Sequence, residues 1–305
     1  TEVDTLSLHD ALPISGGAPA NVSVGLARLG AKSTFLGKVG KDVLGEFLKD
    51  TLENYGVRTN QMFLTPDTRT GVVFVTNAED GERSFDFYID PSADRFLEAG
   101  EIDETDFTEH KILHFGSISM ISSPAKEATH HAVKLAKENG MLVSYDPNLR
   151  LGLWDTEENA RETILSMLGE ADFLKISEEE LEFITGEKEM DAGVEKMRKY
   201  NIPLMIITMG AEGCHVYTKD GHKHVPAMKV KAVDTTGAGD AFVSGMLYRL
   251  NELEGDIASL TVDQAGEMAS FAAVSGALAA STKGAMTALP TLQEVKSHLK
   301  GDAQE

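Results

Sequence analysis

Residues 233–242 have the types and the spacing needed to hold and transfer a phosphoryl group. They read Val-Asp-Thr-Thr-Gly-Ala-Gly-Asp-Ala-Phe, and apolar residues then recur at helical spacing. Gly237 and Gly239 carry no side chain, so a bulky anion can approach the backbone there. The first N–H groups of a helix have no partner within it, and the helix dipole favours negative charge beside them. The stretch therefore predicts an anion site built from the amides of Gly237, Ala238 and Gly239.

One carboxylate, that of Asp240, falls in the first turn of this predicted helix. A bound phosphate repels a carboxylate, so the residue needs another reason to be there. The simplest one is that Asp240 acts as a general base for a hydroxyl that attacks the phosphate. The alternative is that Asp240 only caps the helix and the glycines only make a turn, since short glycine motifs are weak evidence.

Composition and charge exclude several classes of protein. The chain has 305 residues, 42% of them hydrophobic, which is enough for a large core. Its net charge of −21 argues against a nucleic-acid partner, and it means that local amides and cations must hold an anionic nucleotide. The single cysteine, Cys214, excludes an internal disulfide and a cysteine-based zinc site. We see neither an apolar run of about 20 residues nor a secretory signal, so we expect a cytoplasmic protein without a membrane partner.

Predicted strands and helices alternate along the chain. We expect strands at 35–40, 71–76, 84–88, 112–116, 141–145, 172–177 and 204–208, and helices at 43–55 and 124–139. Strands 71–76 and 84–88 alternate in polarity around residues 79–81, as in a hairpin that covers a site. The rhythm predicts an α/β fold with a mostly parallel central sheet, helices on both faces and a small β-sheet lid.

Polar residues stand where the buried strands end. Open parallel sheets bind ligands beyond the carboxyl ends of their strands, so Asp146, Asn148 and Arg150 are well placed for function. A turn with a charged rim is the alternative for these three. Ser177 and Glu180 have the spacing of a helix capping box. We expect His114, inside strand 112–116, to be a hydrogen-bonded core histidine and not a catalyst.

Residues 234–242 resemble, residue for residue, the C-terminal signature of the ribokinase-like (PfkB-type) sugar kinases. Residues 16–21, Gly-Gly-Ala-Pro-Ala-Asn, resemble the N-terminal signature of that family. Residues 146–150, Asp-Pro-Asn-Leu-Arg, and residues 288–291, Ala-Leu-Pro-Thr, resemble its fructokinase branch. The resemblance extends from residue 16 to about residue 299. It implies a single kinase domain over residues 16–305, with lid segments near 33–40 and 70–90.

The resemblance implies a role for each matching residue. The catalytic set is the base Asp240, the anion hole of Gly237, Ala238 and Gly239, and Arg150. The sugar is held by Gly16, Gly17 and Asn21 together with Asp240. ATP is bound by Lys175, Thr208, Gly210 and Gly213 together with Gly237 and Gly239. Glu180 orders Mg²⁺ through water, although Ser177 stands where the family has Asn. A monovalent cation, most simply K⁺, is held near Asp234, Thr236, Ala279, Thr282 and Gly284.

These roles imply an ATP-dependent sugar kinase, and the closest resemblance is to fructokinases, which phosphorylate the 6-hydroxyl of fructose. The alternatives within the family are 2-keto-3-deoxygluconate kinase and ribokinase. Its partners would be a small-molecule sugar and ATP, and the lid offers a surface for a homodimer.

The first fifteen residues do not fit the pattern, because they lack the family's buried first strand and its substrate-binding Asp. We interpret residues 1–15 as an aberrant leader, foreign to the native fold. Asp10 as a displaced substrate Asp is the alternative. If the leader impairs catalysis, the chain would be a sugar- or nucleotide-binding homologue of an enzyme instead.

Overall fold

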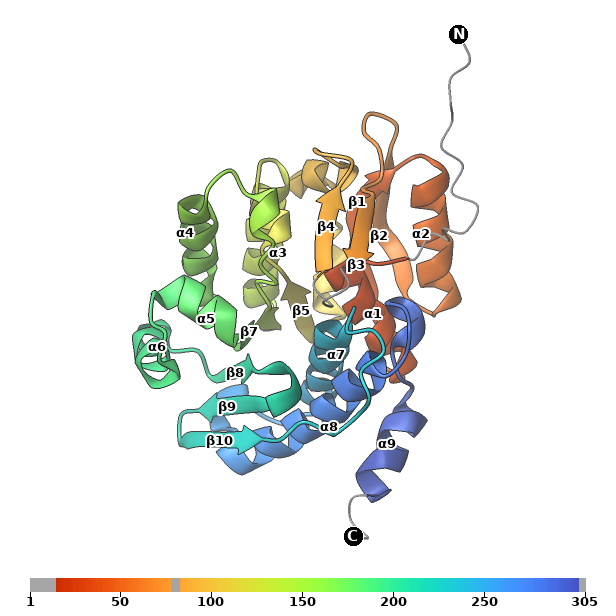
Figure 1. Cartoon of the computed structure of the whole chain (residues 1–305). Helices are drawn as coiled ribbons and strands as arrows, with labels where there is room; N and C mark the ends of the chain where they lie inside the picture. Colours follow the sequence, from red (N-terminus) through yellow and green to blue (C-terminus); the bar gives the residue numbers. More distant parts are fainter. Residues whose placement is uncertain (1–14, 78–82, 302–305) are drawn as a thin grey trace.

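A six-stranded sheet runs through the centre of the computed structural model, which describes residues 15–77 and 83–301 (Figure 1). The strand order is β10-β9-β8-β7-β6-β5. The neighbours β5 (Ile112–Phe115), β6 (Leu142–Tyr145), β7 (Phe173–Ser177) and β8 (Leu204–Thr208) are parallel. Strands β9 (Cys214–Thr218) and β10 (Gly221–Val225) continue the sheet in antiparallel orientation. The expected mostly parallel sheet is therefore confirmed.

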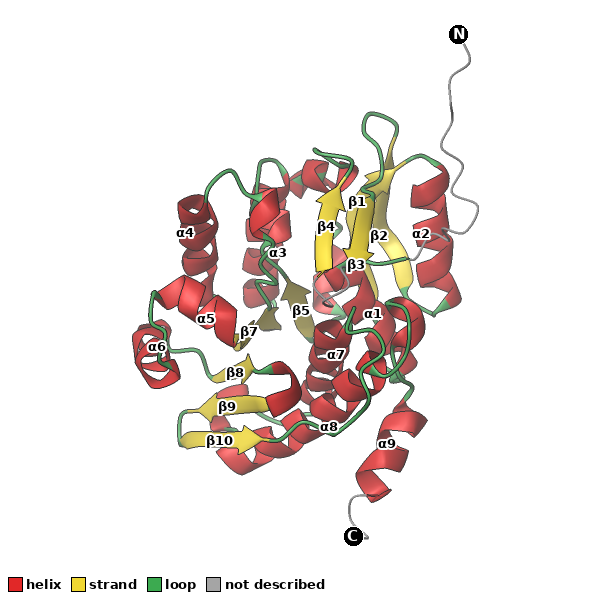
Figure 2. Cartoon of the chain, viewed as in Figure 1, coloured by secondary structure: helices red, strands yellow, loops and turns green. Residues whose placement is uncertain are grey.

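Helices cover both faces of this sheet, because its strands are apolar on both sides (Figure 2). One face carries α3 (Ala125–Glu138), α4 (Glu157–Leu168), α5 (Glu178–Thr185) and α6 (Met190–Met197). The other carries α7 (Ala238–Asn251) and α8 (Val262–Ala280). Successive residues of a strand point to opposite faces, so Phe173 packs on the α7 side and Leu174 on the α3 side.

Two further strand pairs lie outside the central sheet. Strand β1 (Thr34–Gly40) pairs in parallel with β2 (Arg58–Thr65), and α2 (Val43–Asn54) connects them. Strands β3 (Val73–Asn77) and β4 (Arg83–Phe87) form the expected antiparallel hairpin. Of the segments assigned to the lid, residues 33–40 thus pair with β2, a strand that we did not predict. The expected turn at 79–81 and residues 1–14 of the proposed leader lie outside the described residues.

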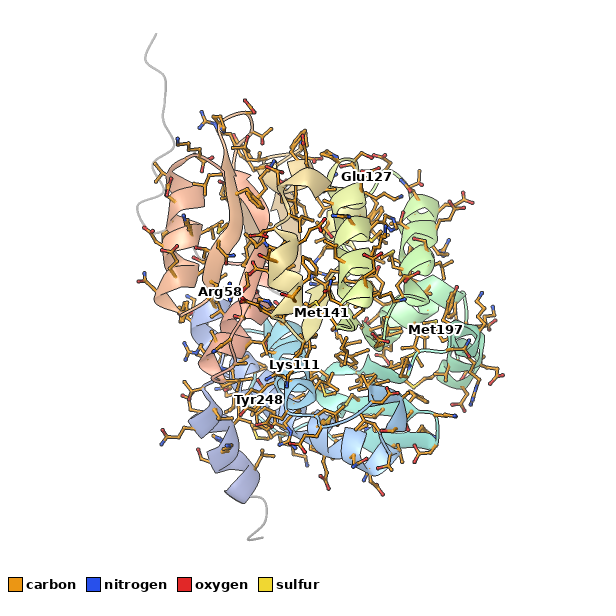
Figure 3. The ribbon with its side chains drawn as sticks, turned by 180° about the vertical axis from the view of Figure 1, so that it is seen from behind. Arg58, Lys111, Glu127, Met141, Met197 and Tyr248 are labelled. Carbon is orange, nitrogen blue, oxygen red and sulfur yellow. The ribbon has the colours of Figure 1, made fainter. Side chains whose placement is uncertain are left out.

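The β1–β2 pair is joined to the rest of the protein by polar contacts. Arg58, labelled in Figure 3, donates from Nη2 to Oδ1 of Asp106 at 2.9 Å. The amides of Asn60 and Gln61 donate to Oδ2 of the same carboxylate. Asp106 lies in a 3₁₀-helix just before β5, so these bonds anchor β2 beside the central sheet.

Two helices complete the fold. Helix α1 (Ala18–Arg28) packs against α7, which brings the N-terminal glycine pair close to the motif at 234–242. Helix α9 (Leu292–Gly301) packs against α8. Among the helices of the described residues, none is long and apolar enough to cross a membrane.

Candidate active site

The start of α7 presents Asp240 to a cavity at the carboxyl ends of the parallel strands. Gly237 is the N-cap of α7 and adopts a left-handed conformation with φ 77°, which explains why this position is glycine. Asp240 follows in the first turn, as predicted. Its Oδ2 accepts a hydrogen bond of 2.7 Å from Nδ2 of Asn21, a buried residue of α1. The α1–α7 packing therefore fixes the orientation of the carboxylate.

The environment of Asp240 suits a base at neutral pH. Burial raises its pKa to about 6, and the nearby Asp146 carboxylate adds to this rise. The hydrogen bond from Asn21 and the positive charges of Lys175 and Arg150 act in the opposite direction. A carboxylate with a pKa near 6 is ionised at pH 7 and still basic enough to accept a proton.

Of the amides beside Asp240, only some are available for the predicted anion site. The Ala238 N–H donates to the carbonyl oxygen of Thr235 at 3.2 Å, so it is already engaged. Within the described residues, no backbone partner is recorded for the Gly239 and Asp240 N–H groups. A Cβ added to Gly239 would lie 3.8 Å from Nζ of Lys175. An ammonium group and two helix-terminal amides thus lie around the same position.

Lys175 belongs to a buried cluster of charges under this position. Its Nζ lies 3.1 Å from Oδ2 of Asp146, and both side chains are about nine-tenths buried. Burial alone would lower the pKa of Lys175, but Asp146 and Glu180 reverse this, so the pKa is raised and the ammonium stays charged. The cluster keeps a positive charge next to the helix start.

Glu180 makes the predicted capping box at the start of α5. Ser177 Oγ accepts from the Glu180 N–H, and Glu180 Oε2 accepts from the Ser177 N–H at 2.8 Å. Its second oxygen, Oε1, accepts from the Leu149 N–H at 2.7 Å. The capping-box prediction is confirmed, and the same carboxylate also holds the loop that leads to Arg150.

The strands become polar where they reach the cavity. On the α7 face, Ile112 is followed by His114, Leu142 by Ser144, and Phe173 by Lys175. The cavity is lined by residues of α1, β5, α7 and the loops after β5 and β6: Ala18, Pro19, His114, Gly116, Ser117, Ile118, Ser119, Asp146, Pro147, Asn148 and Asp240. Asp146 and Asn148 are thus placed as predicted. Residues 116–119 were missed, although they follow a buried strand just as residues 146–150 do.

The N-terminal glycine pair borders this region through α1. Gly17 is the N-cap of α1 and has φ 107°. A Cβ added to Gly16 or Gly17 would meet no atom within 4 Å, so both positions face open space. Asn21 lies one turn further along α1, where it holds Asp240. The predicted sugar contacts of these three residues remain predictions.

The turn after β8 contains the glycines assigned to ATP. Gly213 has φ 101°, and a Cβ there would lie 2.1 Å from the Val225 carbonyl oxygen, so local packing explains this glycine. Gly210 has φ 54° and open space beside it. Thr208 Oγ1 donates to the Ile176 carbonyl oxygen at 3.3 Å. Of Thr208, Gly210 and Gly213, Gly210 is therefore the residue with open space beside its backbone, where a ligand could approach.

The two segments assigned to a monovalent cation lie side by side. Asp234 Oδ1 accepts from the Thr236 N–H at 3.0 Å, and Oδ2 accepts from the Gly284 N–H at 3.1 Å. The N–H groups of Val233 and Asp234 donate to the carbonyl oxygen of Ala280. The Ala279 carbonyl oxygen accepts from the Thr282 N–H at 3.1 Å. Asp234 therefore bridges the two segments.

Comparison with known proteins agrees with this geometry. The profile of the pfkB family carbohydrate kinases matches residues 13–292, so the chain belongs to that family and has its ribokinase-like fold. It is 47% identical over 300 residues to probable fructokinase-6, chloroplastic, of Arabidopsis thaliana, covering 96% of this chain and 77% of the relative.

Two solved structures extend the comparison. A fructokinase double mutant from Vibrio cholerae O395, in its fructose-, ADP- and potassium-bound form, is 40% identical with a TM-score of 0.88. The alignment covers 94% of this chain and 91% of that one. Fructokinase from Xylella fastidiosa with bound ATP is 36% identical with a TM-score of 0.89, over 96% and 92% of the two chains.

Proposed function

We propose that this protein is a fructokinase, which transfers the γ-phosphoryl group of ATP to the 6-hydroxyl of fructose. The observation that carries the proposal is Asp240, held by Asn21 at the start of α7 beside amides and an ammonium group. The fructokinase names of the relatives support fructose as the sugar. The two other sugars considered, ribose and 2-keto-3-deoxygluconate, have no comparable support here.

In this account Asp240 takes the proton from the attacking hydroxyl. Asn21 occupies its Oδ2, which leaves Oδ1 for the sugar. As the proton moves to Oδ1, the sugar oxygen becomes a stronger nucleophile and attacks the γ-phosphorus in line with the leaving ADP oxygen. The Gly239 and Asp240 amides and the Lys175 ammonium hold the charge on the transferred phosphoryl group. Arg150, whose positive charge favours the ionised form of Asp240, would assist in holding this charge.

The residues present fit a Mg²⁺ ion held mainly by water and nucleotide phosphates. The described residues contain no group of three or more His, Cys, Asp or Glu side chains that could hold a metal ion. Each carboxylate oxygen of Glu180 accepts one hydrogen bond from a backbone amide. Each oxygen keeps a further lone pair that can accept a hydrogen bond from water. When bound, Mg²⁺ would be ordered by Glu180 through water and would neutralise part of the phosphate charge.

The segments joined by Asp234 fit a monovalent cation, and we propose K⁺. Carbonyl oxygens of the turn at 279–284, the Asp234 carboxylate and Thr236 would supply oxygen ligands there. A cation in this place would stiffen the loop before Gly237 and add positive charge beside the anion site. Activity should then be higher in KCl than in tetramethylammonium chloride at equal ionic strength. Equal rates in the two salts would show that the reaction does not depend on a monovalent cation at this place.

A panel of sugars tests the substrate. Fructose, ribose, 2-keto-3-deoxygluconate and glucose are each supplied with ATP and Mg²⁺, and ADP release is followed. Fructose should give the highest kcat/KM, and phosphorus–proton NMR should place the new phosphate on C6. A higher kcat/KM for ribose or 2-keto-3-deoxygluconate would identify that sugar, and not fructose, as the substrate. Binding of sugar or ATP without any ADP release would instead support the impaired homologue.

We also propose a homodimer formed through the β3–β4 hairpin. Val73 and Phe74 on β3 are each 42% exposed, and Tyr88 just after β4 is 71% exposed. Phe74 and Tyr88 contact each other edge to face, with ring centroids 5.6 Å apart. Exposed aromatic side chains that pack together on a two-stranded sheet, as Phe74 and Tyr88 do, are typical of a surface that another protein covers. The cytoplasmic location stays a prediction.

A further inference from the structure

His114 is a cavity residue that takes no part in the phosphoryl transfer described for Asp240. It lies near the carboxyl end of β5 and lines the same cavity as Asp240. Its neighbour in the register of β6 is Ser144, so the two side chains share the α7 face of the sheet. His114 Nδ1 lies 2.9 Å from Ser144 Oγ. The expected hydrogen-bonded histidine is present, but it is also part of the cavity wall.

The contact with Ser144 fixes which nitrogen carries the proton. Ser144 is fully buried, and within the described residues His114 Nδ1 is the partner recorded for its hydroxyl group. A buried hydroxyl group donates where it can, so Ser144 donates and Nδ1 accepts. The proton of a neutral imidazole then sits on Nε2. No protein partner is recorded for Nε2 in the described part of the chain, and it is not among the buried unpaired atoms.

The imidazole stays neutral under working conditions. Burial lowers the pKa of His114 to about 4, and the positive charge of Lys175 acts in the same direction. A neutral Nε2–H group in a cavity wall is a donor without an acceptor. A sugar hydroxyl oxygen is an acceptor of the right kind, and Asp240 at the same cavity needs a hydroxyl within reach.

We propose that His114 binds the sugar by donating a hydrogen bond from Nε2 to one of its hydroxyl oxygens, and that Ser144 positions the ring for this. The proposal rests on the proposed function and adds a sugar-binding residue to it. A sugar held by His114 would lie in the cavity that Asp240 also lines, where its reacting hydroxyl group can meet the carboxylate. His114 is thus a determinant of which sugars bind productively.

Two amide variants separate binding from mere packing. In His114→Gln the side-chain amide can reach the place of Nε2, whereas in His114→Asn it can replace only Nδ1 and keep the contact with Ser144. We expect KM for fructose to rise about 3- to 10-fold in His114→Asn, the worth of one neutral hydrogen bond, with KM for ATP unchanged. His114→Gln should lie closer to the wild type. A structural role would reverse this order, because only Asn keeps the bond to Ser144.

Binding measured by calorimetry makes the test independent of turnover. The Kd for fructose should rise in His114→Asn and return toward the wild-type value in His114→Gln. Among fructose analogues that each lack one hydroxyl group, the analogue without the hydroxyl group that His114 contacts should bind the wild type and His114→Asn equally well. His130→Gln, an exposed histidine on α3, is the matched control. An unchanged fructose Kd in His114→Asn, or the reversed order, overturns the inference. If fructose binds as expected and no ADP is released, the proposed function fails and the role of His114 stands.

Discussion

At the scale of single residues, the chemistry depends on how several neighbours act on one carboxyl group. Burial raises the pKa of Asp240, and Asn21 is the largest influence that lowers it again. The same amide also holds Oδ2 in place, so Asn21 influences both the basicity and the orientation of the Asp240 carboxylate, the proposed base. The balance leaves a pKa of about 6, at which an ionised carboxylate still accepts a proton readily.

The acid limb of the pH–rate profile should report this balance. Because Asp240 must be ionised to act as a base, kcat/KM should rise with pH and level off above about 6. Asn21→Ala removes a hydrogen bond that favours the ionised form, so its acid limb should move to higher pH. The profiles are measured with fructose from pH 4.5 to 9. Coincident acid limbs in the two proteins would show that Asp240 is not the titrating base.

At the scale of elements, the start of α7 needs two glycines for different reasons. Gly237 has φ 77°, a backbone conformation in which a residue with an L side chain is strained. Gly239 lies within the first turn of the helix, and the nearest atom to an added Cβ is Lys175 Nζ at 3.8 Å, an ordinary contact. The fold therefore does not require glycine at position 239, and we propose that the absent side chain matters instead for the approach of a phosphoryl group.

Two alanine substitutions should separate these reasons. Gly239→Ala should leave the free energy of unfolding unchanged or raise it by up to about 1 kcal/mol, since Ala favours the helix. Its kcat should fall at least about 10-fold, because a methyl group stands between the amides and Lys175. Gly237→Ala is the contrast and should lose about 1–2 kcal/mol of stability. Urea unfolding and steady-state kinetics measure both. Full activity in Gly239→Ala would place the phosphoryl group elsewhere.

The elements show how far the sequence could predict this fold. Strands β5 to β8 were found because they are short and mostly apolar, and the capping box because its two side chains are close in the sequence. Strand β2 was missed because its inward positions include polar side chains. Gln61 is 2% exposed, yet it is held by the carbonyl oxygen of Asp103 and by Asp106, residues more than 40 positions away. No hydrophobic period could reveal such a strand.

The site was predictable where a motif is contiguous and less so where it is assembled. Asp240, the glycines around it and Asp146 were located from short strings of residues. The bond from Asn21 to Asp240 spans 219 positions, and the pairing of His114 with Ser144 depends on strand register. Only the folded chain shows that Asn21 holds Asp240 or that His114 reaches the cavity.

At the scale of the whole molecule, a net charge of −21 opposes both nucleotide binding and self-association. Screening by salt weakens this repulsion, since the Debye length falls to about 10 Å at 0.1 M. The exposed apolar side chains on the β3–β4 hairpin act in the opposite direction. The oligomeric state should therefore depend on ionic strength as well as on these side chains.

Light scattering can decide the role of the hairpin. The wild type should have the mass of a dimer at 0.15 M salt, with a larger dimer fraction at higher salt. Phe74→Asp with Tyr88→Asp should give a monomer, because two charges enter a contact that excludes water. Val43→Asp is the control, since Val43 is 85% exposed on α2 and outside the hairpin. A wild-type protein that stays monomeric at all salt concentrations would contradict the proposed dimer.

The most direct test of the whole account is fructose-dependent ADP release by the wild type and by Asp240→Asn. Asn keeps the size of the side chain but cannot take a proton. We predict that the variant binds ATP and fructose with nearly unchanged Kd, while kcat falls roughly 10²–10⁴-fold, the usual worth of a general base. A variant that loses ATP affinity and keeps the wild-type kcat would contradict the assignment of Asp240 as the base, and with it the mechanism.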